Sequence, residues 1–125
     1  ISVGASTSDY SSDLIAGFSN YGKSSVDVFA PGTRIYSSYP NNKYEFAQGT
    51  SMAAPLVSGI AALLFSQYPK LSASEVKKII MVSGLPIKKE VALEDGTISL
   101  MNNLCKSGRL VNAYNALIMA SKLSK

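Results

Sequence analysis

Gly49-Thr50-Ser51-Met52-Ala53-Ala54-Pro55 places a serine where a polar turn gives way to a long uncharged segment. From Met52 to Tyr68 no residue is charged. Apolar side chains follow one another in this segment instead of forming a single stripe: Leu56, Val57, Ile60, Ala61, Ala62, Leu63, Leu64 and Phe65. A helix that is hydrophobic all round is expected to be buried. The stretch therefore predicts a core helix with a serine at its start.

A membrane span is the competing interpretation of this segment. A transmembrane helix needs about 20 predominantly apolar residues. The segment is shorter than that, and Pro55, Ser58 and Gly59 interrupt it. We therefore predict no membrane span.

Proline is tolerated near a helix start, so Pro55 indicates that the helix begins close to Ser51. The first N–H groups of a helix lack helical acceptors, and the peptide dipoles add partial positive charge there. Such an environment stabilises the anionic intermediate of acyl transfer. The simpler interpretation is that Thr50 or Ser51 is only an N-cap, a common use of both residue types.

Residues 49–55, with Val57 and Gly59 after them, resemble the nucleophile motif of the subtilisin-like serine proteases, the subtilase family (peptidase S8). Leu56 stands where many members carry a histidine that is not the catalytic one. The resemblance covers most of the chain and is weakest over residues 85–107. Further segments similar to the family are Ile1–Ala5, Phe18–Gly22, Val26–Gly32, Ile35–Ser37 and Gly108–Ala113.

The resemblance implies an α/β fold, a subtilisin-like three-layer domain with a mostly parallel sheet. Residues 1–125 would be the C-terminal part of the catalytic domain, so that only the C-terminal half is present. Ser51 would be the nucleophile that forms the acyl-enzyme, and its own backbone N–H would be one oxyanion donor. Gly49, Thr50, Met52 and Pro55 would support the turn.

The family's catalytic Asp and His and its oxyanion Asn would then lie upstream of Ile1. The implied substrate is a peptide or protein, and the implied partner is the N-terminal half of the same domain. We expect this chain alone to be inactive and to hold no metal or other cofactor, although the full-length protein could bind calcium. The family also implies a secreted, cell-surface or periplasmic location.

Histidine is absent from all 125 residues. A serine nucleophile needs an adjacent base, usually histidine, so the chain cannot hold a complete triad. In α/β-hydrolases the nucleophile lies in G-x-S-x-G and the histidine follows it, whereas here residue 53 is alanine and no histidine follows. In the subtilisin order aspartate and histidine precede the serine. Asp9, Asp13 and Asp27 precede Ser51, but none lies in a stretch resembling the family's aspartate motif. A non-catalytic interaction domain or a pseudoenzyme remains the alternative.

Composition and charge place the chain among core-forming proteins. It is 46% hydrophobic with a mean hydropathy of +0.14, enough for one domain or part of one. The net charge of +4 is spread over single lysines without a basic stripe, so we predict no nucleic-acid binding. Cys105 is the only cysteine, which excludes an internal disulfide and is typical of a small buried side chain.

Periodicity and capping residues predict the other elements. We expect strands at residues 1–3 and 26–30, and a hairpin of 35–39 with 44–46 whose tyrosines pack on half-buried faces. Ser72 and Glu75 form a capping-box pattern that starts a helix ending at Ser83. A last helix follows Asn112 as N-cap. Between residues 85 and 107 only the turn at 94–96 is indicated.

Overall fold

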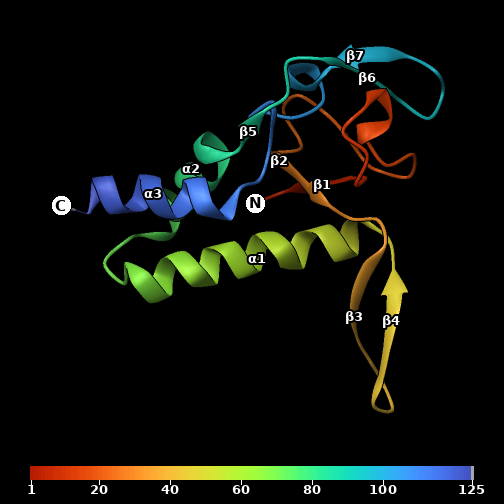
Figure 1. The fold of residues 1–125 in the computed structure, drawn as a ribbon. Coiled ribbons are helices and arrows are strands. Elements are labelled where there is room, and N and C mark those ends of the chain that lie inside the picture. Colours follow the sequence, from red (N-terminus) through yellow and green to blue (C-terminus); the bar gives the residue numbers. More distant parts are fainter. Residues whose placement is uncertain (125) are drawn as a thin grey trace.

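The structure, a computed structural model, describes residues 1–124 (Figure 1). Eight strands, three α-helices and two single-turn 3₁₀ helices follow one another along these residues. In chain order they are β1 (Val3–Ser6), η1 (Ser12–Leu14), β2 (Val28–Pro31), β3 (Ile35–Tyr39), β4 (Lys43–Ala47), α1 (Thr50–Gln67), α2 (Ala73–Ser83), β5 (Leu85–Pro86), β6 (Glu90–Ala92), β7 (Ile98–Leu100), η2 (Met101–Asn103), β8 (Arg109–Leu110) and α3 (Ala113–Leu123).

The central sheet is mixed and mostly parallel, in the order β1-β2-β8-β5. β1 and β8 both run parallel to β2, and only the two-residue β5 is antiparallel to its neighbour. The register between β1 and β2 runs from Val3 opposite Val28 to Ser6 opposite Pro31. The predicted α/β class is confirmed, but the predicted bounds of the first strand, residues 1–3, were wrong. Ile1 and Ser2 are exposed, and the buried strand begins only at Val3.

Successive residues of β2 point to opposite faces of the sheet, as the period of a strand requires. Val28 and Ala30 pack with residues of all three helices in one core. Phe29, between them, packs on the other side with Met101, Leu104 and Cys105. The loops, η1, η2 and the β6–β7 hairpin supply that second side, so the sheet lies between two layers (Figure 1). The expected three-layer arrangement is confirmed.

Helices α2 and α3 begin where their capping residues predict. Ser72 Oγ accepts the Glu75 N–H at 3.3 Å, and Glu75 Oε2 accepts the Ser72 N–H at 2.7 Å, so the capping box is complete. Asn112 Oδ1 accepts the Asn115 N–H at 2.8 Å and caps α3. Both helices pack on each other and on α1.

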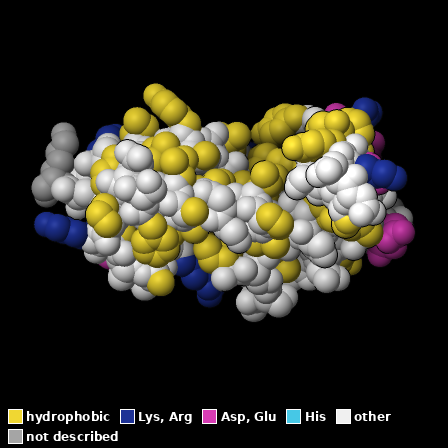
Figure 2. Space-filling model, turned by 90° about the horizontal axis from the view of Figure 1, so that it is seen from below, with side chains coloured by type: hydrophobic (Ala, Val, Ile, Leu, Met, Phe, Trp, Pro, Cys, Tyr) yellow, Lys and Arg dark blue, Asp and Glu magenta, His cyan; other side chains and the backbone are white. Residues whose placement is uncertain are grey.

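Helix α1 differs from its prediction, because it is not buried all round. Only Ala53, Val57 and Leu64 are buried within it. These three side chains contact the sheet and the other two helices, whereas Leu63 and Phe65 are each 39% exposed. Seen from the side of α1, the surface carries hydrophobic side chains over its whole width, and charged groups lie toward its edges (Figure 2). Nothing among residues 1–124 covers this face, so its apolar side chains remain exposed.

By length and composition alone, α1 is apolar enough to cross a membrane, and 17% of its residues are buried. Core helices of soluble proteins pass the same test, but they are mostly buried, whereas α1 is mostly uncovered within residues 1–124. Its one buried stripe on a sheet, with the hydrogen-bonded turn that begins it, fits the core helix of a layered domain.

The predicted hairpin is confirmed as β3 paired antiparallel with β4, and it extends away from the body of the molecule (Figure 1). Its tyrosines are not half-buried, as was predicted, but exposed: Tyr36 by 61% and Tyr44 by 64%. Tyr36 instead stacks on Tyr44, and its ring also lies 5.0 Å from that of Phe46. These rings pack on one another because no other described element reaches this face.

Candidate active site

Ser51 is the second residue of α1, and it is exposed. The helix cap is Gly49, which has φ +148° and makes no side-chain cap bond. Neither Thr50 nor Ser51 caps the helix, so the interpretation of these residues as simple N-caps is wrong. The Ser51 hydroxyl is not used to begin the helix.

Backbone hydrogen bonds attach this turn to the carboxyl end of the sheet. The Gly32 N–H donates to the Ser6 carbonyl at 2.9 Å, and the Gly49 N–H donates to the Gly32 carbonyl at 2.8 Å. The Gly49 carbonyl in turn accepts the N–H groups of Met52 at 3.0 Å and Ala53 at 3.3 Å, which starts α1. Ser51 is therefore positioned from β1 through two glycines.

Gly32 lies where no side chain fits. A Cβ added there would lie 2.6 Å from the Ala5 Cβ and 2.8 Å from the Gly49 carbonyl oxygen. Gly49 itself has a positive φ, which disfavours any residue with a Cβ. Glycine at both positions is thus a requirement of the turn that presents Ser51.

The first turn of α1 has the electrostatics that an anion needs. Within residues 1–124, no backbone acceptor is bonded to the Ser51 N–H, and the first turn contains no acidic residue. The dipole of the 18-residue helix adds partial positive charge at this end. Pro55 lacks an N–H, so the Ser51 carbonyl loses the partner that residue i+4 normally supplies.

The other motif residues lie around the turn as neighbours. Met52 is half-buried, and its Sδ would be 3.5 Å from a Cβ placed at Gly49. Thr50 is half-buried as well, whereas Pro55 is exposed within the helix. Met52 therefore packs beside the cap, which holds the turn from its helical side.

None of the three preceding aspartates is placed to serve Ser51. Asp9 is exposed in the loop after β1, and Asp13 is exposed in η1. Asp27 is 8% exposed, and its Oδ2 accepts the Ser2 N–H at 2.9 Å and lies 3.0 Å from Lys77 Nζ. Burial raises the pKa of Asp27, but the Ser2 N–H and the Lys77 ammonium outweigh it and hold that pKa below its ordinary value. Asp27, which directly precedes β2, joins Ser2 to α2 and has a structural role.

Within residues 1–124, no three His, Cys, Asp or Glu side chains gather closely enough to hold a metal ion. Sequence reasoning predicted a role for Ser51 and its motif, and that role stays a prediction. The same reasoning missed Gly32, although the Pro31-Gly32 dipeptide marked a turn. The close approach of Gly32 to Ala5 and Gly49 depends on a contact between distant segments.

Comparison with known proteins identifies the family to which these features belong. The model of the subtilase family matches residues 1–108. Subtilisin DY of Bacillus licheniformis is 53% identical over 62 residues, which are 50% of this chain and 22% of that protein. The isp6 putative subtilase-type proteinase of Schizosaccharomyces pombe is 42% identical over 104 residues, 81% of this chain and 21% of that protein. The chain thus spans about a fifth of the length of these two relatives.

Solved structures agree with the sequence comparison. The subtilase cytotoxin of the SubAB assembly superposes with a TM-score of 0.78 at 26% identity, over 98% of this chain and 36% of that one. The A-subunit of an AB5 toxin from E. coli gives a TM-score of 0.77, also at 26% identity, over 96% of this chain and 37% of that one. With a family match over most of its length and a subtilase fold around Ser51, the chain belongs to the subtilase family of subtilisin-like serine proteases.

Proposed function

We propose that this chain is the C-terminal part of the catalytic domain of a serine endopeptidase, and that Ser51 is its nucleophile. The observation that carries the proposal is the exposed Ser51 in the first turn of α1, with its N–H unbonded among the described residues. In this mechanism Ser51 Oγ attacks the peptide carbonyl and forms an acyl-enzyme, which water then hydrolyses. The Ser51 N–H donates to the oxyanion of each tetrahedral intermediate.

The base that takes the Ser51 proton comes from outside this chain, since none of the 125 residues is histidine. We assign it, the aspartate that orients it and the second oxyanion donor, an asparagine, to the upstream part of the full-length protein. The relatives support this assignment, because the chain covers only 21–22% of the two described above. By itself the chain is inactive in this proposal.

The exposed face of α1 indicates how that upstream part is held. Leu56, Leu63 and Phe65 are each 39% exposed, on a helix without a charged residue. Contiguous apolar surface of this kind marks an interface. We assign it to the N-terminal half of the same domain, which would cover α1 and bring the base to its first turn.

Substrates are peptides or proteins, as the family's protease activity implies. A location outside the cytoplasm, secreted or on the cell surface, is supported by relatives such as the cell wall-associated protease of Bacillus subtilis, 47% identical over 68 residues. The proposal assigns no cofactor to this chain. A calcium site elsewhere in the full-length protein stays a prediction.

Active-site labelling tests the proposal. We expect a fluorophosphonate to add one equivalent to the full-length protein at Ser51, detected by intact mass and peptide mapping. Ser51→Ala should abolish both labelling and peptide hydrolysis. Ser58→Ala is the matched control, because Ser58 lies on the same helix, is exposed and bonds only the Ala54 carbonyl.

Two results would contradict the proposal. Peptide hydrolysis that survives Ser51→Ala would remove Ser51 from the chemistry. A folded full-length protein that neither labels nor cleaves peptides would favour the alternative, a subtilase-like interaction domain without catalysis.

A further inference from the structure

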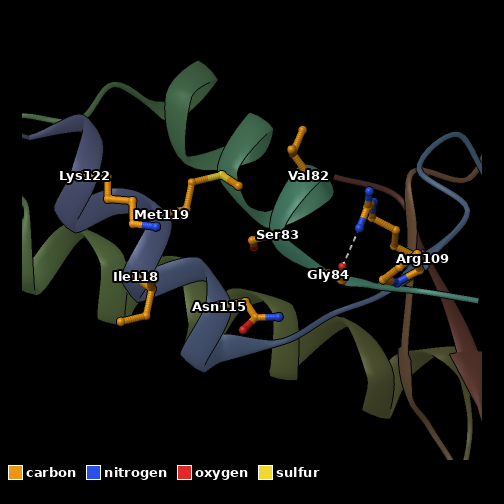
Figure 3. A pocket seen from close by; sticks show the side chains of 9 residues that line it. Val82, Ser83, Gly84, Arg109, Asn115, Ile118, Met119 and Lys122 are labelled. Carbon is orange, nitrogen blue, oxygen red and sulfur yellow. Dashed lines mark hydrogen bonds between the residues drawn. The ribbon is translucent and has the colours of Figure 1, made fainter.

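A cavity of about 340 Å³ lies away from Ser51, between the end of α2, β5, β8 and α3 (Figure 3). It shares no residue with the turn around Ser51. Its polar side chains come from three elements: Ser83 from α2, Arg109 from β8, and Asn115 and Lys122 from α3. Figure 3 shows Ser83 between Arg109 on one side of the cavity and Lys122 on the other.

Ser83 gives the first indication of a ligand. The residue is 6% exposed, and among the described residues its Oγ has no hydrogen-bond partner. A buried hydroxyl without a partner is destabilising, and native structures contain few of them. Serine has a single side-chain torsion, so turning its hydroxyl toward a ligand needs no backbone movement. The position favours a ligand that satisfies this hydroxyl.

The charge of the cavity selects an anion. Arg109 and Lys122 line it, and no acidic side chain does. The carboxyl end of the α2 dipole opposes an anion here, but Arg109 Nη1 donates to the Gly84 carbonyl at 2.8 Å and offsets part of that field. That bond also fixes the guanidinium, which retains other N–H donors for a carboxylate.

One wall of the cavity is apolar. Val82, Ile118 and Met119 line it beside the cations. A neighbouring groove of about 520 Å³ between α2 and α3 shares Val82, Met119 and Lys122 with the cavity. It continues to Ile79 and Leu123, and Glu75 and Lys78 also line it. Lys122 thus lies at the junction of a polar cavity and an apolar groove.

From this juxtaposition we propose that the cavity binds an aliphatic monocarboxylate. The carboxylate accepts hydrogen bonds from Arg109 and the Ser83 hydroxyl, Lys122 adds positive charge from the opposite side of the cavity, and the hydrocarbon chain lies along Met119 in the groove between α2 and α3. This ligand uses both the cations and the apolar wall, which an inorganic anion or a neutral lipid would not.

Calorimetric titration of the full-length protein with straight-chain carboxylates tests the proposal. From butanoate to octanoate, each added methylene should tighten binding about fourfold, as burial of one CH₂ predicts. Octanol and inorganic phosphate are the two comparison probes, and each should bind at least tenfold more weakly than octanoate. Raising the salt concentration should weaken octanoate binding.

Two variants assign the contacts. Lys122→Gln should weaken octanoate binding about fivefold, whereas Lys106→Gln, an exposed lysine outside the cavity, should not change it. Ser83→Ala should weaken binding by a similar factor and yet raise the Tm of the unliganded protein, because it removes an unsatisfied buried hydroxyl. A merely structural Ser83 would give a lower Tm.

The proposal is overturned if octanoate gives no binding, if octanol or phosphate binds as tightly, or if affinity does not change with chain length. A lower Tm for Ser83→Ala would equally refute it. None of these readouts depends on peptidase activity, so failure here leaves the assignment of Ser51 untouched.

Discussion

Gly32→Ala should displace Ser51, the proposed nucleophile, although Ser51 itself is unchanged. The added Cβ would lie 2.6 Å from the Ala5 Cβ and 2.8 Å from the Gly49 carbonyl oxygen, and neither neighbour is a flexible side-chain end. Carbon atoms pack at about 3.5–4.0 Å, so one of the two segments must retreat by about 1 Å. Ala5 is held in β1 by its pairing with β2, whereas Gly49 belongs to a turn. We expect Gly49 to move.

That movement has two measurable costs. Overpacking of a close contact destabilises a protein by about 1–3 kcal/mol. The Gly49 carbonyl accepts the first two hydrogen bonds of α1, so its displacement carries Ser51 with it. A misplacement of about 1 Å in a catalytic group can lower the rate about 10²-fold. The rate should therefore fall by more than the loss of folded protein explains.

The assay compares the rate of fluorophosphonate labelling with urea unfolding in the full-length protein. Gly17→Ala is the control, because the nearest atom to its added Cβ is Glu94 Cγ at 3.8 Å, an ordinary contact. It should leave labelling unchanged and stability within about 0.5 kcal/mol. If the Gly32→Ala variant is labelled at the wild-type rate and unfolds at the wild-type urea midpoint, then Gly32 and Gly49 do not position Ser51 relative to β1.

Three further predictions concern stability and burial. Asp27→Asn should lower the free energy of unfolding, measured in urea near neutral pH, by about 1.5–3 kcal/mol. This loss should shrink below about pH 4, because the lowered pKa makes Asp27 stabilising only while it is ionised. Ala62→Lys on the exposed face of α1 should lower the free energy of unfolding of the full-length protein by about 3 kcal/mol or more, as measured in urea. Tyr114→Lys, at a 72% exposed site, is the control. If both variants lose equally little stability, nothing covers this face of α1. Cys105, fully buried, should react with a thiol reagent only on unfolding, so rapid reaction of the native protein would contradict its placement.

Local signals in the sequence predicted the elements whose causes are local. The capping box of Ser72 and Glu75 begins α2, and Asn112 begins α3, because both caps depend on residues three positions apart. The motif around Ser51 was readable for the same reason. Gly49 and Pro55 predicted a turn at the helix start, and the likeness to a known family is the basis of the chemistry proposed for Ser51.

What the sequence did not predict depends on contacts between distant segments. β1 begins at Val3 instead of Ile1, since its register is set by pairing with β2. The β6–β7 hairpin carries no strong alternation, and its Val91 is buried only because it reaches the core beneath Phe29. Gly32 was visible as a turn residue, but its closeness to Ala5 was not. The cavity around Ser83 likewise joins residues from four separate elements.

The unexpected exposure of α1 and the absence of histidine have one explanation in the proposed full-length enzyme. An uncharged, largely apolar helix needs cover on every side, and residues 1–124 cover only the side of Ala53, Val57 and Leu64. Ser51, in the first turn of the same helix, needs a base that this chain lacks. A single upstream segment packed on α1 would meet both needs, since its burial of the helix would also fix its histidine relative to Ser51. Folding and catalysis are then coupled: Ala62→Lys, 11 residues from the nucleophile, should slow fluorophosphonate labelling to the extent that it loosens the two halves.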